Sequence, residues 1–125
     1  MKKAFITDQA PRPVGPYSQV VQCGQFLFLA GQVPLTPEGT MREGDIAVQT
    51  RQVLNNLRAV LETAGATMND VVKTTIFLAD LADFETVNKV YAEYFQEPFP
   101  ARSTVEVSKL PKGARLEIDA IAIIG

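Results

Sequence analysis

The sequence has 125 residues, of which 46% are hydrophobic and 21% are charged, and its formal net charge is −2. This length and composition are typical of one globular domain over residues 1–125, and the charge argues against a general nucleic-acid binder, which needs a basic surface. The chain has no histidine and one cysteine, Cys23, which excludes imidazole catalysis, histidine metal sites and an intrachain disulfide.

The N-terminus does not have the pattern of a targeting segment. Lys2 and Lys3 are not followed by the apolar run of about 7–15 residues that a signal peptide contains. No apolar run in the chain approaches the roughly 20 residues of a membrane span. We therefore expect a soluble protein located in the cytoplasm.

Three short strands are predicted in the first third of the chain. The β-favouring runs are Lys3–Ile6, Ser18–Cys23 and Phe26–Ala30. Residues 8–16, between the first two runs, hold three prolines and a glycine, which predicts an extended loop. A second loop follows the third strand and is marked by Gly31, Pro34, Pro37 and Gly39.

A helix, a strand and a second helix are predicted next. Apolar residues recur at helical spacing from about Asp45 to Ala64, and Gly65 supplies the stop. The run Val71–Leu78 is rich in β-branched residues and predicts a strand. Asp83 can cap the second helix, whose apolar side carries Phe84, Val87, Tyr91, Tyr94 and Phe95 before Pro98 and Pro100 prevent its continuation.

The last two predicted strands are Ala101–Ser108 and Ala114–Ile124, around the turn residues LPKG. The order β-β-β-α-β-α-β-β predicts an α+β fold in which two helices cover one face of a sheet of about six strands, mostly antiparallel. Both faces of the last strand become apolar toward its end, which is not typical of a sheet with one wet face. We infer that the second face is also buried, against other copies of the chain.

Arg102 stands where a strand begins, in the run FPARSTVEV. One interpretation is a charged residue that protects an edge strand or makes a surface ion pair. The other is a carboxylate anchor, because a guanidinium matches a carboxylate with two hydrogen bonds and stays charged. The small neighbours Ala101, Ser103 and Thr104 leave room beside it, which favours the anchor.

Glu117 and Asp119 lie on one face of the last predicted strand. They are either a polar lining or a pair of which one orients or deprotonates a water molecule. In a hairpin that turns symmetrically around LPKG, Glu106 lies opposite Glu117 and on the same face as Arg102. Arg102 and Glu117 are then about 13 Å apart along the strands. One small substrate reaches both only if the register differs or a neighbouring chain supplies one of them.

Three further residues are candidates for ligand contact. Asn88 lies in the apolar stripe of the second helix and is either a buried structural amide or a ligand contact. Tyr17 offers a phenol at the end of the proline-rich loop, although most such tyrosines pack. Gly31 ends a buried strand, where it is either a turn glycine or a position at which bare backbone approaches a ligand.

Taken together, five segments resemble the RidA/YjgF (reactive intermediate deaminase A) family nearly from end to end. These are GPYSQ at 15–19, FLAGQVP at 28–34, QTRQVLNNL at 49–57, VNKVYAEYF at 87–95 and PARSTVEVSKLPKGARLEIDAIA at 100–122. The resemblance implies a chorismate-mutase-like α+β subunit and a homotrimer whose sheets form a central barrel. It also implies hydrolysis of 2-imino acids and their enamines, such as 2-aminoacrylate, 2-iminobutyrate and 2-iminopropanoate, to 2-keto acids and ammonia, with no metal or cofactor.

The resemblance also assigns roles in a cleft between subunits. Arg102 matches the carboxylate-binding arginine and Glu117 the glutamate associated with the attacking water, while Tyr17, Gly31 and Asn88 match further positions that line the cleft. Many deaminating members have a cysteine where this chain has Thr104, and we expect that departure to alter rate or substrate preference. Alternatives are a regulatory trimer that binds keto or amino acids without turnover, a translation-inhibiting or ribonuclease-like protein, and a chaperone-like protein.

Overall fold

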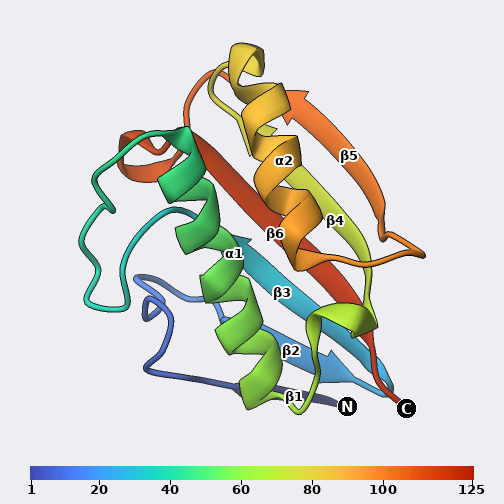
Figure 1. The fold of residues 1–125 in the computed structure, drawn as a ribbon. Coiled ribbons are helices and arrows are strands. Elements are labelled where there is room, and N and C mark those ends of the chain that lie inside the picture. The colour runs from blue at the N-terminus through green and yellow to red at the C-terminus, as the bar shows by residue number, and fades with distance from the viewer.

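Six strands form one mixed sheet in the computed structural model, which describes residues 1–125 (Figure 1). The spatial order is β1-β2-β3-β6-β4-β5. Four neighbouring pairs are antiparallel, and β4 and β5 are parallel. The prediction of about six mostly antiparallel strands is therefore confirmed. The strands are β1 (Lys2–Phe5), β2 (Val20–Cys23), β3 (Phe26–Gln32), β4 (Val71–Leu78), β5 (Ala101–Glu106) and β6 (Leu116–Ile123).

Two helices, α1 (Ile46–Thr63) and α2 (Phe84–Tyr94), lie side by side on one face of the sheet, as predicted (Figure 1). The Asp45 side chain accepts a hydrogen bond from the amide of Val48, which caps the first turn of α1. Gly65 follows the helix with a φ of +84°, and its amide donates to the carbonyl of Glu62. Both predicted ends of this helix are therefore confirmed to within a residue or two.

The start of α2 differs from the prediction. Asp83 precedes the helix but makes no capping hydrogen bond with its side chain. Its backbone is already helical, with φ −82° and ψ −5°, whereas a capping side chain reaches back from an extended backbone. The Asp83 carboxylate instead accepts from the guanidinium of Arg115. Asp80 caps a preceding 3-10 turn by accepting from the amide of Ala82.

The predicted hairpin around LPKG is wrong. β5 and β6 both form but do not pair, because β6 inserts between β3 and β4 while β5 pairs with the far side of β4. The helix α2 carries the chain back between β4 and β5, and such a crossover connects parallel strands. Glu106 is therefore level with Leu78, whereas Glu117 is level with Phe77 and points to the other face.

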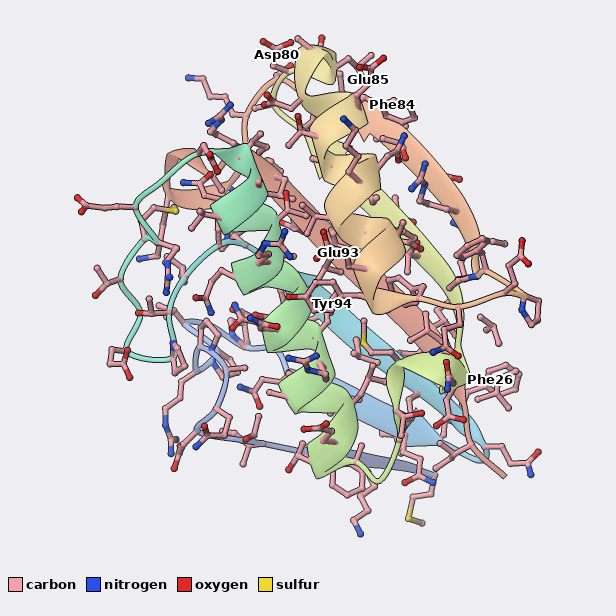
Figure 2. All side chains as sticks on the ribbon, viewed as in Figure 1. Phe26, Asp80, Phe84, Glu85, Glu93 and Tyr94 are labelled. Carbon is pink, nitrogen blue, oxygen red and sulfur yellow. The ribbon has the colours of Figure 1, made fainter.

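The two faces of the sheet differ in burial. The face under the helices holds the core, which includes Leu27, Ile76 and Ile118, each at most 1% exposed. The opposite face carries several exposed apolar side chains: Phe26 (labelled in Figure 2), Phe28, Val105 and Ile123. This second surface is called the open face below. Neither helix is both long enough and apolar enough to cross a membrane.

Candidate functional site

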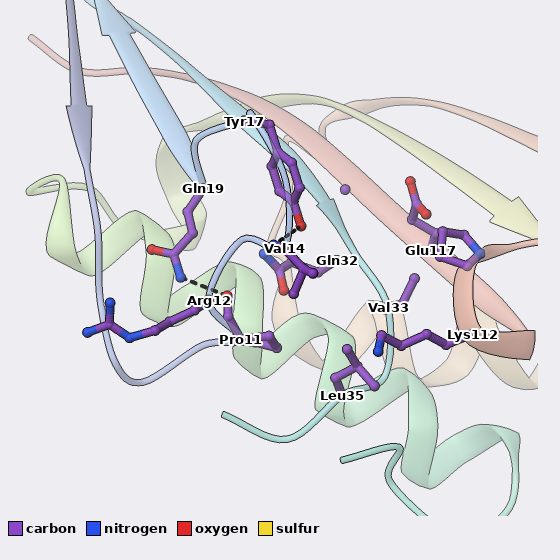
Figure 3. A pocket seen from close by; sticks show the side chains of 12 residues that line it. Pro11, Arg12, Val14, Tyr17, Gln19, Gln32, Val33, Leu35, Lys112 and Glu117 are labelled. Carbon is purple, nitrogen blue, oxygen red and sulfur yellow. Dashed lines mark hydrogen bonds between the residues drawn. The ribbon is translucent and has the colours of Figure 1, made fainter. Parts of the chain in front are cut away.

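One cavity of about 320 Å³ lies among the proline-rich N-terminal loop, the end of β3 and the start of β6 (Figure 3). Tyr17 comes from the loop, Gly31 from β3, Lys112 from the turn before β6 and Glu117 from β6. These four residues are called the glutamate half-site. Three of the six residues expected in the site therefore meet here: Tyr17, Gly31 and Glu117.

The carboxylate of Glu117 is half-buried and makes no hydrogen bond or ion pair within the chain. Burial raises the pKa of Glu117 above its ordinary value of 4.5, and the negative charge of Asp119 raises it further. A general base works best when its pKa is close to the working pH. The environment of Glu117 therefore raises its pKa, which is the direction that suits a general base.

Tyr17 is fixed by the loop that carries it. Its phenol oxygen accepts from the amide of Val14 at 3.5 Å (dashed line in Figure 3), and the residue is 55% exposed. The loop is held by Gln19, which is 2% exposed and accepts from the amide of Thr7 at 2.8 Å. The Gln19 amide also donates to the carbonyls of Thr7 and Pro11. A single buried amide thus ties the loop to the sheet.

Lys112 lines the glutamate half-site, although no pattern in the sequence singles it out. Its φ of 58° puts a non-glycine residue in the left-handed region, which is uncommon. The residue lies in the short 3-10 turn Pro111–Gly113. The only signal in the sequence is its place in LPKG, which predicts a turn and no contact with a ligand. No carboxylate of the chain pairs with the Lys112 ammonium group.

A second hollow, of about 310 Å³, lies between α2 and the edge strand β5. Asn88, Tyr91 and Arg102 are among its lining residues and are called the arginine half-site. The Arg102 guanidinium lies 4.9 Å from the ring centroid of Tyr91 and 5.6 Å from that of Phe84 (labelled in Figure 2). The sequence pattern predicts both rings only as part of the apolar side of the helix.

The Arg102 guanidinium has no ion pair and no hydrogen bond within the chain. The neighbouring phenol is no counterion, because burial raises the pKa of Tyr91 and keeps the group neutral. The aromatic rings attract the cation through their faces. They leave its hydrogen-bonding edge available, and a carboxylate matches that edge with two parallel bonds.

Two buried oxygens, one on α2 and one on β5, lack hydrogen-bond partners. They are Oδ1 of Asn88 and Oγ1 of Thr104, which follows Arg102 on the same face of β5. Buried polar atoms normally have partners, so each unpaired atom needs an explanation. A ligand or a second chain that brings a donor to this edge would supply one.

The two half-sites lie on opposite faces of the sheet. Arg102 is level with the buried Thr74 on the helix side, whereas Glu117 is level with Phe77 and points to the open face. Strand spacing puts their backbones roughly 14 Å apart. The expectation that Glu106 is opposite Glu117 is also wrong, because β5 and β6 do not pair as a hairpin. One chain therefore cannot bring Arg102 and Glu117 to the same small molecule.

The arrangement limits the chemistry of each half. No three His, Cys, Asp or Glu side chains are grouped closely enough to hold a metal ion. The arginine half-site can bind a small carboxylate, and the glutamate half-site can orient water and move a proton. Two copies of the chain would have to meet for both actions to serve one substrate.

Comparison with known proteins agrees with this fold. The sequence model of a family described as Endoribonuclease L-PSP matches residues 7–124. A RutC family protein of Pyrococcus horikoshii is 55% identical over 123 residues, which is 98% of each chain. A protein of Escherichia coli K12 named 2-iminobutanoate/2-iminopropanoate deaminase is 46% identical over 126 residues, again 98% of each chain.

Solved structures give the same result. RidA from an Antarctic Psychrobacter superposes with a TM-score of 0.94 at 43% identity, over 98% of this chain and 99% of that one. Escherichia coli TdcF, crystallised with bound serine, superposes with a TM-score of 0.93 at 40% identity over the same shares. The α+β fold and the sequence matches together show that this chain belongs to the RidA/YjgF/L-PSP (Rid) family.

Proposed function

We propose that the protein hydrolyses reactive 2-imino acids and their enamine tautomers, such as 2-aminoacrylate, 2-iminobutyrate and 2-iminopropanoate, to 2-keto acids and ammonia. The observation that carries this proposal is Arg102, a half-buried guanidinium that lies over two aromatic rings without a counterion. A cation held in this way is prepared for a small carboxylate. The 46% identity to the Escherichia coli imine deaminase supports the choice of substrate.

The working site is proposed to lie in a cleft between copies, with the arginine half-site of one chain facing the glutamate half-site of the next. Two observations support this arrangement. Arg102 and Glu117 are on opposite faces of the sheet of one chain, and the open face carries Phe26, Phe28 and Ile123 in contact with water. A homotrimer with its open faces packed into a central barrel would bury those side chains.

The reaction then needs few groups. Arg102 binds the substrate carboxylate and fixes the imine carbon in the cleft. Glu117 takes a proton from a water molecule as the water oxygen bonds to that carbon, and the protonated Glu117 passes this proton to the imine nitrogen, which gives a carbinolamine. Glu117 then moves the hydroxyl proton of the carbinolamine to the amino nitrogen as the carbon–nitrogen bond breaks, which leaves a keto acid and ammonia and returns Glu117 to its starting state. Positioning and one general base supply the acceleration.

The other expected residues complete the cleft. Asn88 and Thr104 each have a buried oxygen free to accept a hydrogen bond beside the arginine half-site. Tyr17 offers its phenol on the glutamate side, from a loop that Gln19 holds in place. Threonine keeps a hydrogen-bonding group where many deaminating members have cysteine. Because the reaction needs no thiol nucleophile, we expect Thr104 to tune rate or preference.

A regulatory protein that binds keto or amino acids without turnover is the second candidate. The same unpaired Arg102 would serve it, and the related TdcF has been crystallised with bound serine. A ribonuclease is less well supported, although the matching family carries that description. The chain has no histidine and a net charge of −2, whereas nonspecific binding to RNA rests on a basic surface. Nothing in the structure favours a chaperone.

The deciding experiment is an assay for imine hydrolysis. A dehydratase generates 2-aminoacrylate or 2-iminobutyrate in the presence of semicarbazide, and keto-acid release is followed with and without this protein. The proposal expects faster release with the protein. Release at the uncatalysed rate, together with binding of 2-oxobutyrate by calorimetry, would instead establish the regulatory candidate.

A mixing experiment tests the shared cleft. Arg102→Lys and Glu117→Gln proteins are each nearly inactive alone, and they are unfolded together and refolded as a mixture. A cleft that takes Glu117 from one variant and Arg102 from the other is intact, so an equal mixture should have about a quarter of wild-type sites. A mixture no more active than its components would contradict a cleft shared in this way.

A further inference from the structure

Gly31 lies in a β-bulge next to Glu117. Leu29 is level with Ala120 and Gln32 with Ile118, so the pairing of β3 and β6 is shifted between them. Two residues of β3, Ala30 and Gly31, therefore face one residue of β6. Such a bulge redirects the strand and its side chains, and bulges are frequent beside active sites.

The backbone of Gly31 does not itself require glycine. Its φ lies outside the left-handed region that other glycines of the chain occupy, such as Gly24 and Gly65. A Cβ atom at this position would lie 2.2 Å from Oε2 of Glu117, 2.8 Å from its Cδ and 2.9 Å from its Cγ. Those are the three nearest atoms, so the space that the missing side chain leaves is occupied by the Glu117 carboxylate.

No hydrogen bond or ion pair within the chain holds this carboxylate in place. The charged and titratable groups around it are few. Asp119 and Lys73 share the open face, on β6 and on the neighbouring β4. The cavity itself is lined by Tyr17, Arg12 and Lys112. Arg12 pairs with the carboxylate of Asp8, so it is not the counterion of Glu117.

We propose that Gly31 is a positioning residue. Because it has no side chain, it leaves a space in which the Glu117 carboxylate lies against the backbone of β3 and faces the cleft, and this space is called the seat below. This role differs from direct contact between Gly31 and a ligand. Its consequence for catalysis rests on the proposed function, whereas the seat itself can be tested without turnover.

The first test is the stability of Gly31→Ala. A glutamate side chain can rotate away from the new methyl group, so the variant should fold with a thermal midpoint within about 2 °C of wild type. The same substitution in a Glu117→Ala background should also leave the midpoint nearly unchanged. A large loss of stability in both backgrounds would overturn the proposal, because glycine would then be required by the bulge and not by Glu117.

The second test follows the carboxylate directly. Carboxyl-labelled glutamate reports the titration of Glu117 by NMR, and Glu117→Gln identifies the signal. A carboxylate displaced from its seat becomes more exposed to solvent. The pKa of Glu117, which burial raises in the wild-type protein, should therefore fall toward its ordinary value in Gly31→Ala. An unchanged titration curve would show that the carboxylate has not moved and would contradict the seat.

The third test measures imine turnover in a double-mutant cycle. Gly31→Ala should lower kcat/KM by roughly tenfold to a hundredfold, because small displacements of a catalytic group have effects of that size. In a Glu117→Ala background the Cγ and carboxylate atoms that the methyl group would meet are absent, so adding Gly31→Ala should lower the residual turnover little further. Equal losses in both backgrounds would point to direct ligand contact by Gly31. A wild-type protein without imine turnover would overturn the proposed function, while the stability and NMR tests still decide the seat.

Discussion

The two half-sites of this chain differ in almost every physical respect. The arginine half-site is on the helix side of the sheet at an edge strand, and its cation lies over aromatic rings. The glutamate half-site is at the opposite face in the middle of the sheet, and its acid is held against bare backbone. The arginine half-site holds a permanent positive charge, whereas the glutamate half-site makes the negative charge of its carboxylate less favourable. Binding and proton transfer need these opposite environments.

Strand geometry explains why one chain can hold both environments without combining them. Successive side chains of a strand point to opposite faces, so residues on different strands share a face only when their registers agree. Arg102 is level with Thr74 and Ala120 on the helix side, and Glu117 is level with Phe77 on the other. The substitutions below separate the contributions of the two halves, from the largest expected effect to the smallest.

Glu117→Gln should have the largest effect on activity. It removes the general base but keeps the shape of the side chain, so kcat for imine hydrolysis should fall by roughly 10²–10⁴-fold. Glu93→Gln is a matched control, because Glu93 pairs with Arg51 on the outer surface of the helices and should cost little. Equal activity of the two variants in the keto-acid assay would remove Glu117 from the mechanism.

The same variant distinguishes loss of chemistry from loss of fold. The pKa of Glu117 is higher in the folded state than the ordinary value of 4.5. Stability from this group is therefore present below the unfolded pKa and is lost as pH rises through the folded pKa. Glu117→Gln lacks that ionisation and should be at least as stable as wild type at neutral pH, as measured by urea unfolding.

Arg102→Lys tests the other half and should lower kcat/KM by about a hundredfold. An ammonium group keeps the charge but cannot reproduce the two parallel bonds of a guanidinium, a loss of about 2–3 kcal/mol. Arg51→Lys, in the exposed pair with Glu93, is the control. Because the lost contact binds the carboxylate, KM for the imine should rise along with any fall in kcat. Wild-type kinetics would contradict the anchor.

Gln19→Leu should have a moderate effect, confined to the glutamate side. It removes the hydrogen bonds to Thr7 and Pro11 that hold the loop carrying Tyr17. We expect the free energy of unfolding to fall by about 2 kcal/mol and activity to fall by about tenfold or less. The affinity of the arginine half-site for a keto acid should change least, and a selective loss there would contradict the assignment of Gln19 to the other half.

Asp119→Asn should have the smallest effect, a shift in pH dependence without a large loss at the optimum. The charge of Asp119 is the second cause of the raised pKa of Glu117, after burial. Removing it lowers that pKa, so the acidic limb of kcat/KM, which rises as the base ionises, should move to lower pH. A shift to higher pH, or none, would mean that Asp119 does not act on Glu117.

Much of the fold follows from local patterns in the sequence. The helix after Asp45 has its cap, its periodic apolar side and its stop at Gly65 within one continuous segment. The run Val71–Leu78 forms the strand that its β-branched residues predict. Such features depend on residues that are close together in the sequence, so they can be predicted from the sequence alone.

The pairing of strands could not be found in the same way. Two β-favouring runs around LPKG look locally like a hairpin, but β6 finds its partners in β3 and β4, which are far away in the sequence. The error carried over to the site, because it put Arg102 and Glu117 on one face. Lys112 was missed for a related reason: its unusual φ and its place in the cavity depend on the folded turn.

The separation of Arg102 and Glu117 by the thickness of the sheet has a consequence for concentration. If the cleft is shared as proposed, an isolated chain contains every necessary side chain and still has no complete site. Specific activity should then fall on dilution below the dissociation constant of the assembly, and a shortage of the protein would reduce function more than in proportion. Two related chains made together could also combine their halves, so that each mixed cleft takes its anchor from one sequence and its base from the other.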